Sequence, residues 1–189
     1  MRFAGAARDI TGGAQLDLGV VRLVVVRPFA RGDEERMREI GPRAFMTLGL
    51  ARLAIDKALP RDRVEEAYRR EVEGYVSRAL RGDESIKILV AEEAGRVVGY
   101  IVLGVDEGRS RLFGFKWGSI VSLAIDPEWW GRGVGTSLVR EGLKWLKSAG
   151  VEYVEVFTDQ NNVAAIRVYE KCGFRVTYSG ILLSQRLDD

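Results

Sequence analysis

A glycine-rich turn between a predicted strand and a predicted helix carries the clearest chemistry in the sequence. Residues 121–136 read Val-Ser-Leu-Ala-Ile-Asp-Pro-Glu-Trp-Trp-Gly-Arg-Gly-Val-Gly-Thr. Amides at a helix N-terminus lack intrahelical acceptors, and the helix dipole places about half a positive charge beside them. Gly131, Gly133 and Gly135 allow the main chain to approach a phosphate closely. The segment predicts an anion site, although a tight strand-to-helix turn without a ligand would use the same residues.

Two common nucleotide-binding motifs do not fit this turn. A P-loop needs a lysine directly before its serine or threonine, and Gly135 stands before Thr136 instead. A dinucleotide fingerprint needs a third glycine three residues after Gly135, where the sequence has Leu138. The predicted anion site therefore belongs to another class of cofactor.

Two separate blocks of the sequence resemble the GNAT superfamily of acetyl-coenzyme A-dependent N-acetyltransferases. Residues 123–127, Leu-Ala-Ile-Asp-Pro, run into residues 131–136, which look like that superfamily's pyrophosphate motif, Gln/Arg-x-x-Gly-x-Gly/Ala. Residues 162–174 are similar to its signature Asn-x-x-Ala-x-x-x-Tyr-x-Lys-x-Gly-Phe. One departure is that Trp130 replaces the leading Gln or Arg of the first motif. The order and separation of the two blocks also agree with the family.

The resemblance implies how acetyl-coenzyme A would be held. The strand before the turn would splay from its neighbour, so that its backbone pairs with the pantetheine arm and the amide of Leu123 stabilises the oxyanion. Charge on Arg132 would compensate for the departure at Trp130. The cofactor-binding residues expected on this basis are Leu123, Ala124, Ile125, Gly131, Arg132, Gly133, Val134, Gly135, Thr136 and Asn162.

Three further residues have roles implied by the resemblance. Tyr169 matches the tyrosine that hydrogen-bonds or protonates the departing thiolate, although a helix tyrosine packed in the core is the alternative. Asn162 matches a pantetheine contact and is equally suited to cap a helix. Glu155 is similar to the Leu-Glu-Val glutamate of ribosomal-protein alanine N-acetyltransferases and is the expected catalytic base.

Strand alternation gives Glu155 a reason to act as a base. It shares a strand face with Tyr153 and Phe157, and an apolar setting would raise a carboxyl pKa toward neutrality. A solvated or ion-paired strand glutamate is the alternative interpretation, and Glu92 and Glu107 are the other candidate bases. An α-amine is already neutral in about a tenth of molecules at pH 7 and so needs little help from a catalytic base. Because no candidate base is clearly positioned, an amine of low pKa is favoured as the substrate.

The composition of the chain limits the possible mechanisms, partners and cellular locations. The chain has 189 residues, no histidine and a formal net charge of +2, which argues against histidine-based triads and against nucleic acid or membrane as a partner. No metal site is expected. The single cysteine, Cys172, cannot form an internal disulfide, so a cytoplasmic setting is expected. Without a histidine to activate Cys172, direct transfer is favoured over a covalent intermediate.

Periodicity predicts an α/β chain of interspersed strands and helices, and the resemblance implies the GNAT acyl-CoA N-acyltransferase fold, a splayed central mixed sheet flanked by helices. Residues 1–19 are expected to be a flexible tail and residues 20–189 a single domain. A polar loop is expected over 106–116. Strands are expected over 20–26, 86–92, 96–105, 119–125 and 151–157, with a closing hairpin of 174–178 and 181–187. Helices are expected from Asp33 to a break at Gly41-Pro42, and over 43–59, 62–80, 134–148 and 162–171.

Two functions of different class follow. The first is an N-acetyltransferase that passes an acetyl group from acetyl-CoA directly to a primary amine, either a protein N-terminal α-amine or a small-molecule amine. The second is a non-catalytic acyl-CoA-binding regulatory domain, which Trp130 would suit, whereas Tyr169 favours the enzyme. Specificity is expected to lie in residues 31–82 and 106–116, and apolar helix faces there would also allow a homodimer.

Overall fold

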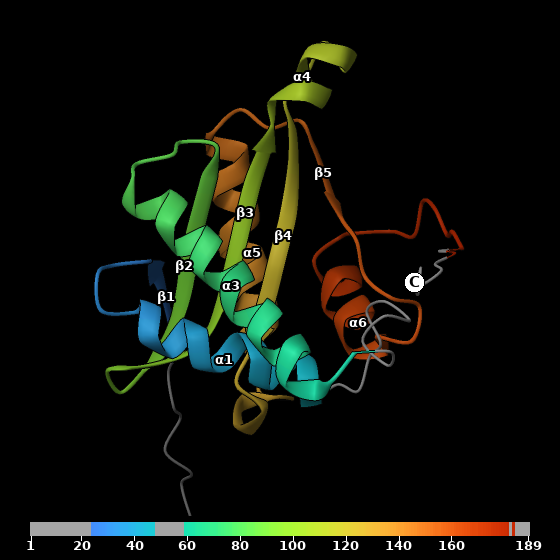
Figure 1. The fold of residues 1–189 in the computed structure, drawn as a ribbon. Helices are drawn as coiled ribbons and strands as arrows, with labels where there is room; N and C mark the ends of the chain where they lie inside the picture. Colours follow the sequence, from blue (N-terminus) through green and yellow to red (C-terminus); the bar gives the residue numbers. More distant parts are fainter. Residues whose placement is uncertain (1–23, 48–58, 182, 184–189) are drawn as a thin grey trace, which may run out of the picture.

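A five-stranded mixed sheet forms the centre of the molecule, with helices on both faces (Figure 1). The computed structural model describes residues 24–47, 59–181 and 183. The spatial order of the strands equals their order in the chain, and only the β4–β5 pair is parallel. This confirms the predicted α/β class with a mixed sheet. The strands are β1 (Val25–Pro28), β2 (Ile86–Glu93), β3 (Arg96–Asp106), β4 (Trp117–Ile125) and β5 (Tyr153–Val156).

The helices divide the core into two parts. Helices α1 and α3 cover one face of the sheet, and α5 covers the other, with α6 beside it (Figure 1). One apolar cluster, which includes Met37, Val72 and Tyr100, lies under α1 and α3, and a second, which includes Leu103 and Leu138, lies under α5. The helical elements are α1 (Glu34–Thr47), α3 (Arg61–Leu80), α4 (Glu107–Phe113), the 3₁₀ turn η1 (Pro127–Trp129), α5 (Val134–Ser148) and α6 (Val163–Lys171).

A β-bulge in β4 changes which side chains face which layer. Leu103 of β3 pairs with Ile120, but the preceding Val102 pairs with Ser122, so Val121 is an extra residue in β4. A bulge shifts the side-chain alternation of a strand by one residue and bends the strand. The residues after Val121 therefore face the opposite layers from those that unbroken alternation would give them.

The packing on each side of the bulge agrees with this shift. Before it, Gly118 faces the α5 side, where a Cβ atom would lie 3.0 Å from Leu146. After it, Ala124 packs in the cluster under α1 and α3, while Leu123 and Ile125 pack against the α5 cluster. Strand β5 pairs with β4 only as far as Ile120, and no other strand among the described residues pairs with that side of β4 beyond this point.

The predicted helix break at Gly41-Pro42 is wrong, because α1 runs through both residues. Pro42 removes one backbone donor, which normally ends or kinks a helix. Gly41 provides the compensation, since a Cβ there would lie 2.7 Å from the Tyr100 hydroxyl oxygen and 2.8 Å from Val72. Close packing on β3 and α3 keeps the helix in place. Most of the helix predicted over 43–59, and residues 20–23 of the first predicted strand, lie outside the described residues.

Two other local predictions are corrected by the structure. The segment predicted as a polar loop contains α4, which begins where the Asp106 carboxylate accepts a bond of 2.8 Å from the Arg109 amide and ends at Gly114 with a φ of +77°. The first strand of the predicted closing hairpin is wrong, because residues 174–178 form no strand. The other strand falls largely on residues outside the described part.

An ion cluster fastens β1 to the start of α1. The Arg27 guanidinium bonds Asp33 at 2.7 and 2.9 Å and Glu92 of β2 at 2.7 Å, and the Ala30 amide donates to Asp33 at 2.8 Å. Burial raises the pKa of Asp33, but the bonds from Arg27 and Ala30 outweigh it and leave that pKa below its ordinary value. The ionised carboxylate therefore contributes stability to the fold.

We expect Asp33→Asn to lower the free energy of unfolding by about 1 to 2 kcal/mol at pH 7, since a charge-assisted bond to Arg27 is lost. A depressed folded-state pKa stabilises the protein above the unfolded pKa of roughly 3.9, and that contribution is lost as pH falls through the lower folded value. In urea unfolding, the free energy of unfolding of the wild-type protein should thus exceed that of Asp33→Asn by the full amount above about pH 5, and by less and less below about pH 4. A pH-independent difference would contradict this role for the carboxylate.

Candidate active site

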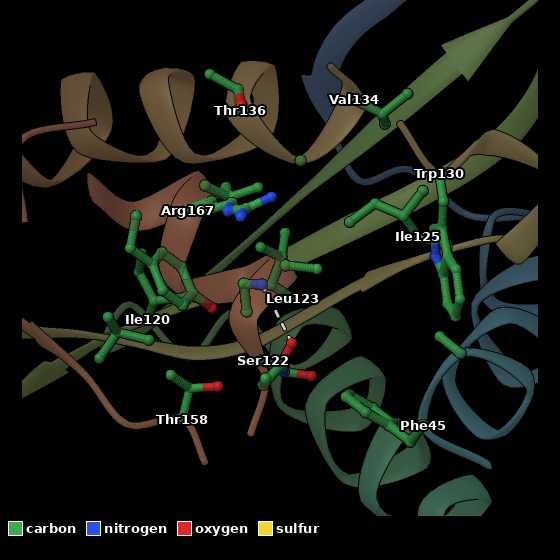
Figure 2. A pocket seen from close by; sticks show the side chains of 18 of the residues that line it. Phe45, Ile120, Ser122, Leu123, Ile125, Trp130, Val134, Thr136, Thr158 and Arg167 are labelled. Carbon is green, nitrogen blue, oxygen red and sulfur yellow. Dashed lines mark hydrogen bonds between the residues drawn. The ribbon is translucent and has the colours of Figure 1, made fainter. Parts of the chain in front are cut away.

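A cavity of about 420 Å³ lies where β4 and β5 diverge (Figure 2). Its volume is in the range of small-molecule and cofactor sites. On the α5 side it is lined by the glycine turn and α6, and on the other side by Phe45 of α1 and Tyr68 of α3. The predicted site residues that line it are Leu123, Ile125, Gly131, Gly133, Val134, Gly135, Thr136, Asn162 and Tyr169.

The glycine turn has the geometry of an anion site. Gly131 and Gly133 have φ values of +74° and +80°, which residues with a Cβ rarely adopt, and no atom lies within 4 Å of where a Cβ would be added. The first helical bond of α5 runs from the Ser137 amide to the Gly133 carbonyl, at 3.0 Å. The amides of residues 134–136 therefore have no intrahelical acceptor and lie at the positive end of the helix dipole.

The backbone of β4 presents polar groups to the gap between the strands. The Asp126 amide donates to Val98 of β3 at 2.9 Å, so the Ile125 carbonyl in the same peptide unit points away from β3. Strand alternation directs the N–H and C=O of Leu123 the same way. By the same rule, the N–H and C=O of Ala124 face β3, and Ala124 is not among the described residues that line the cavity.

Trp130, which replaces the Gln or Arg of the family motif, makes a structural contact. Its indole N–H donates to the gap-facing carbonyl of Ile125 at 2.8 Å and so joins the end of β4 to the glycine turn. The guanidinium of Arg132 lies over the Trp129 ring, 4.8 Å from its centroid, and Arg132 is absent from the described cavity lining. Arg167 of α6 does line the cavity (Figure 2). The positive charge that faces the cavity here thus comes from α6 rather than from the turn.

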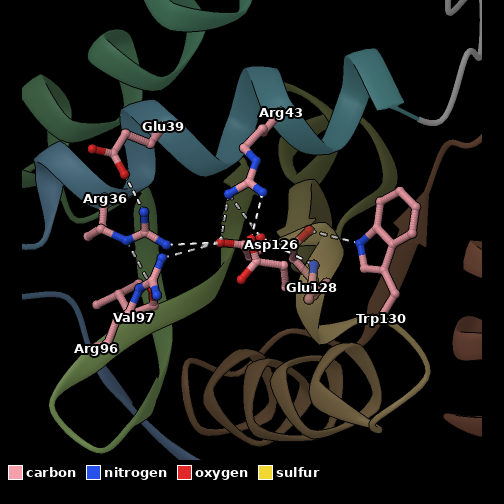
Figure 3. Close-up of polar contacts among 9 residues, drawn as sticks. Arg36, Glu39, Arg43, Arg96, Val97, Asp126, Glu128 and Trp130 are labelled. Carbon is pink, nitrogen blue, oxygen red and sulfur yellow. Dashed lines mark hydrogen bonds and ion pairs between the residues drawn. The ribbon is translucent and has the colours of Figure 1, made fainter.

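A buried carboxylate holds the turn against α1 (Figure 3). Asp126 is fully buried and lies 3.0 Å from Arg36, 3.4 Å from Arg43 and 4.0 Å from Arg96. It also accepts a bond of 3.3 Å from the Glu128 amide, which caps η1. Several cationic partners and a backbone donor offset the cost of burying one carboxylate. The end of β4 and the first turn of the loop are therefore fixed relative to α1.

Helix α6 supplies the remaining predicted residues. Asn162 caps the helix through a bond of 3.1 Å from the Ala165 amide, and it also lines the cavity. Tyr169 is buried, and its ring packs edge-on against Phe174 with 5.7 Å between centroids. Burial raises the pKa of the Cys172 thiol, with Arg140 opposing the shift, so the thiolate is scarce near neutral pH. This favours direct transfer over a covalent cysteine intermediate.

The apolar setting expected for Glu155 is wrong. Its carboxylate forms an ion pair with Arg109, because α4 carries that side chain over β5, and Glu155 is not among the described residues of the cavity lining. Glu92 is engaged by Arg27 at 2.6 Å, and Glu107 lies near Arg111 at 3.8 Å. The acidic residue found in the described lining is Asp159, in the turn before α6.

Several residues that line the cavity were missed by sequence reasoning. They come from segments far apart in the chain, and no motif assigned a role to any of them. The Ser122 hydroxyl is buried and has no hydrogen-bond partner among the described residues, so it is available to a ligand. The missed lining residues that bear on function are Phe45, Tyr68, Ser122, Asp159 and Arg167. Ser122, Asp159 and Arg167 lie within or beside a quoted motif, whereas no sequence signal marks Phe45 and Tyr68.

Comparison with known proteins agrees with this geometry. The profile of the Acetyltransferase (GNAT) family matches residues 49–174, more than half of the chain. The chain belongs to the GNAT acetyltransferase family. Within the described residues, this GNAT domain has no helix long and apolar enough to cross a membrane. The same residues contain no cluster of three acidic or cysteine side chains that would suit a metal ion.

Curated relatives of this GNAT domain include mycothiol acetyltransferases. The one from Nocardiopsis dassonvillei is 25% identical over 170 residues, which cover 90% of this chain and 48% of the relative. The one from Thermobifida fusca is 28% identical over 86% of this chain and 47% of the relative. The chain thus spans about half the length of these curated relatives.

Solved structures share the fold. The PaiA N-acetyltransferase from Thermoplasma acidophilum, determined in complex with coenzyme A, superposes with a TM-score of 0.65 at 18% identity, covering 84% of this chain and 93% of that one. A transcriptional regulator from Bacillus halodurans superposes with a TM-score of 0.62 at 23% identity, over 86% and 100% of the two chains. At these identities the likeness establishes the GNAT fold.

We expect Gly133→Ala to raise the dissociation constant for coenzyme A about tenfold or more in calorimetry. A residue with a Cβ pays about 1 to 2 kcal/mol in the left-handed region, so the turn relaxes away from the conformation that presents its amides. Gly82→Ala is the matched control, because Gly82 also has a positive φ, +74°, and open space, but lies after α3. It should lower thermal stability and leave the affinity unchanged. Equal affinity in folded Gly133→Ala protein would contradict the site.

Proposed function

We propose that the chain transfers the acetyl group of acetyl-CoA to a primary amine in the gap between β4 and β5. The observation that carries the proposal is the pairing of two features in one cavity. The gap-facing backbone of Leu123 lies on one side and the open N-terminus of α5 on the other. Together they match a molecule with a diphosphate at one end and a thioester at the other.

The cofactor end of the cavity supports binding of the diphosphate. The amides of residues 134–136 converge at the start of α5, and the two positive-φ glycines leave open space in front of them. Arg167 adds a cation from α6. The gap-facing carbonyl of Leu123 would accept a hydrogen bond from an amide group of the pantetheine arm, which would extend the sheet by one strand-like element.

The chemical step then uses the amide of Leu123. The amine nitrogen attacks the thioester carbonyl, the C=O electron pair moves onto oxygen, and the N–H of Leu123 stabilises that oxyanion. Oxyanion donors of this kind are typically worth about 3 to 4 kcal/mol. Collapse of the intermediate breaks the C–S bond and releases the thiolate. The nitrogen loses one proton and the thiolate sulfur gains one, so the products are an amide and free coenzyme A.

Tyr169 would stabilise the leaving thiolate. It lines the cavity from α6, and its ring is held by Phe174, so the hydroxyl has little freedom to turn away. A thiol pKa of about 8.5 lies below the tyrosine value of about 10, so a hydrogen bond with late proton transfer is easier than full early donation. A purely structural role for Tyr169 can be distinguished from this one, because phenylalanine keeps the ring and removes only the hydroxyl.

Asp159 would accept the amine proton; this is supported by its position in the cavity lining, from which Glu155, paired with Arg109, is absent. An α-amine or other low-pKa amine needs little help, because a useful fraction is already neutral near pH 7. The acceptor is then a small amine, which the name of the mycothiol acetyltransferase relatives would suit, or a peptide N-terminus.

Release of free thiol from acetyl-CoA with a panel of amines tests the function. Turnover is expected with at least one α-amine, and Tyr169→Phe should lower kcat about 10- to 100-fold at unchanged coenzyme A affinity, the range for losing a hydrogen bond to a charged group. Tight binding without turnover on any amine would identify a non-catalytic acyl-CoA-binding domain instead. A wild-type kcat in folded Tyr169→Phe protein would remove the role of the hydroxyl.

The two carboxylates can be compared directly. With a short amine substrate, Asp159→Asn should lower kcat/KM about tenfold or more on the low-pH side of the profile, where the amine proton has to be removed. Glu155→Gln is the control and should change kcat/KM less than about twofold between roughly pH 6 and 9. The reverse ranking of the two variants would return the base role to Glu155.

A further inference from the structure

Four aromatic rings gather on the surface at the end of the sheet where β4 begins. Trp117 of β4 and Tyr153 of β5 lie 4.3 Å apart between ring centroids, and Phe113 lies 5.1 Å from Trp117. Phe115 contacts the other three at 5.9 to 6.5 Å. Tyr153 is 39% exposed and Phe113 52% exposed. We call these four residues the aromatic platform. Exposed apolar groups gathered in this way mark binding surfaces.

The aromatic platform lies on the face of the sheet from which an acceptor would approach. Before the bulge, Gly118 faces α5, so Trp117, Ser119 and Val121 face the other layer. Because Trp117 is level with Tyr153, the side chains of β5 on this face belong to Tyr153 and Glu155, and Phe157 follows directly after the strand. Val121 and Phe157 line the cavity, and Phe157 is 81% exposed. The platform and the mouth of the cavity are thus two ends of one surface.

The separation of the two ends sets the size of the occupant. Val121 lies four positions after Trp117 in β4, which corresponds to about 13 Å at roughly 3.3 Å per residue. Leu123, whose amide faces the thioester in the proposed reaction, lies about 17 Å from Trp117, because their partners on β3, Ile101 and Asp106, are five positions apart. An extended peptide has the same rise per residue. Its N-terminal amine in the gap would place its fifth or sixth residue over the platform.

Polar groups along this path suit a peptide backbone. The Ser122 hydroxyl near the gap and the indole N–H of Trp117 are both buried without a hydrogen-bond partner among the described residues. Ser122 lines the cavity, so a ligand group that reaches its hydroxyl would recover the free energy that an unpartnered buried polar group costs. Between them lies the ion pair of Arg109 and Glu155, with the guanidinium 5.3 Å from the centroid of Trp117. The middle of the path is polar and its far end is aromatic.

We propose that the acceptor is an extended peptide whose N-terminal amine enters the gap beside Ser122 and whose fifth or sixth residue packs on the aromatic platform. The proposal rests on the proposed acetyl transfer and assigns its substrate class. It makes Phe113 and Tyr153 specificity-determining residues that act on affinity for the peptide and leave the chemical step unchanged.

Peptides that share an N-terminus and carry one phenylalanine, moved from position 3 to position 8 in a Ser/Gly background, test this. For the wild-type protein, kcat/KM should be highest with phenylalanine at position 5 or 6, by about three- to tenfold, as expected for one aromatic contact. Tyr153→Ala and Phe113→Ala should each raise KM for that peptide and abolish the position dependence. Neither should alter kcat/KM for a dipeptide amide or the KM for acetyl-CoA.

Val25→Ala is the matched control, because Val25 is 59% exposed on β1 at the other edge of the sheet, and it should retain the full preference. Turnover of small amines with no gain from peptide length or phenylalanine position would overturn this proposal and leave the acetyl transfer standing. An equal loss on dipeptide and long peptide in the two platform variants would also overturn it. Absence of turnover on every amine would contradict the acetyl transfer itself.

Discussion

The parting of β4 from β5 is the constraint on which the rest of the structure depends. β4 remains bonded to β3 along its whole length, but its other side loses its partner after Ile120. Backbone groups at the centre of a domain need hydrogen-bond partners, and leaving them unpaired is costly. The bulge at Val121 bends the strand at this point and turns Leu123 toward α5 and α6. In the proposed function, a cofactor arm that acts as a substitute strand would resolve this deficit, so the architecture that opens the sheet would also select its ligand.

Rigid support at the end of β4 keeps this opening in a fixed shape. The buried carboxylate of Asp126 faces three guanidinium groups from α1 and β3, while the Trp130 indole bonds the Ile125 carbonyl. These contacts involve the two residues that flank the 3₁₀ turn and so determine where the glycine turn begins. Preorganised amides stabilise charge without reorganising during the reaction, and this requires a turn that is held in one conformation.

The two sides of the cavity are built in different ways. The cofactor side comes from two continuous stretches, β4 with its glycine turn and α6 with its cap. The opposite side combines α1, α3, β5 and the side chains of β4 that face α1 and α3. It continues to the aromatic platform, which includes Phe113 of α4. A shared cofactor can be recognised by a short fixed motif, whereas an acceptor is recognised by a surface whose parts vary independently.

The sequence by itself determined most of the strands and helices, the glycine turn and the placement of Asn162 and Tyr169 on one helix. Those features depend on local rules, namely glycine conformation, helix capping and the spacing of residues within one element. Tertiary structure decided the continuity of α1 through Pro42, where packing on Tyr100 and Val72 outweighs a local break. It also paired Glu155 with Arg109 and brought Asp159 into the cavity, because the neighbours of a charged side chain are set by elements far away in the chain.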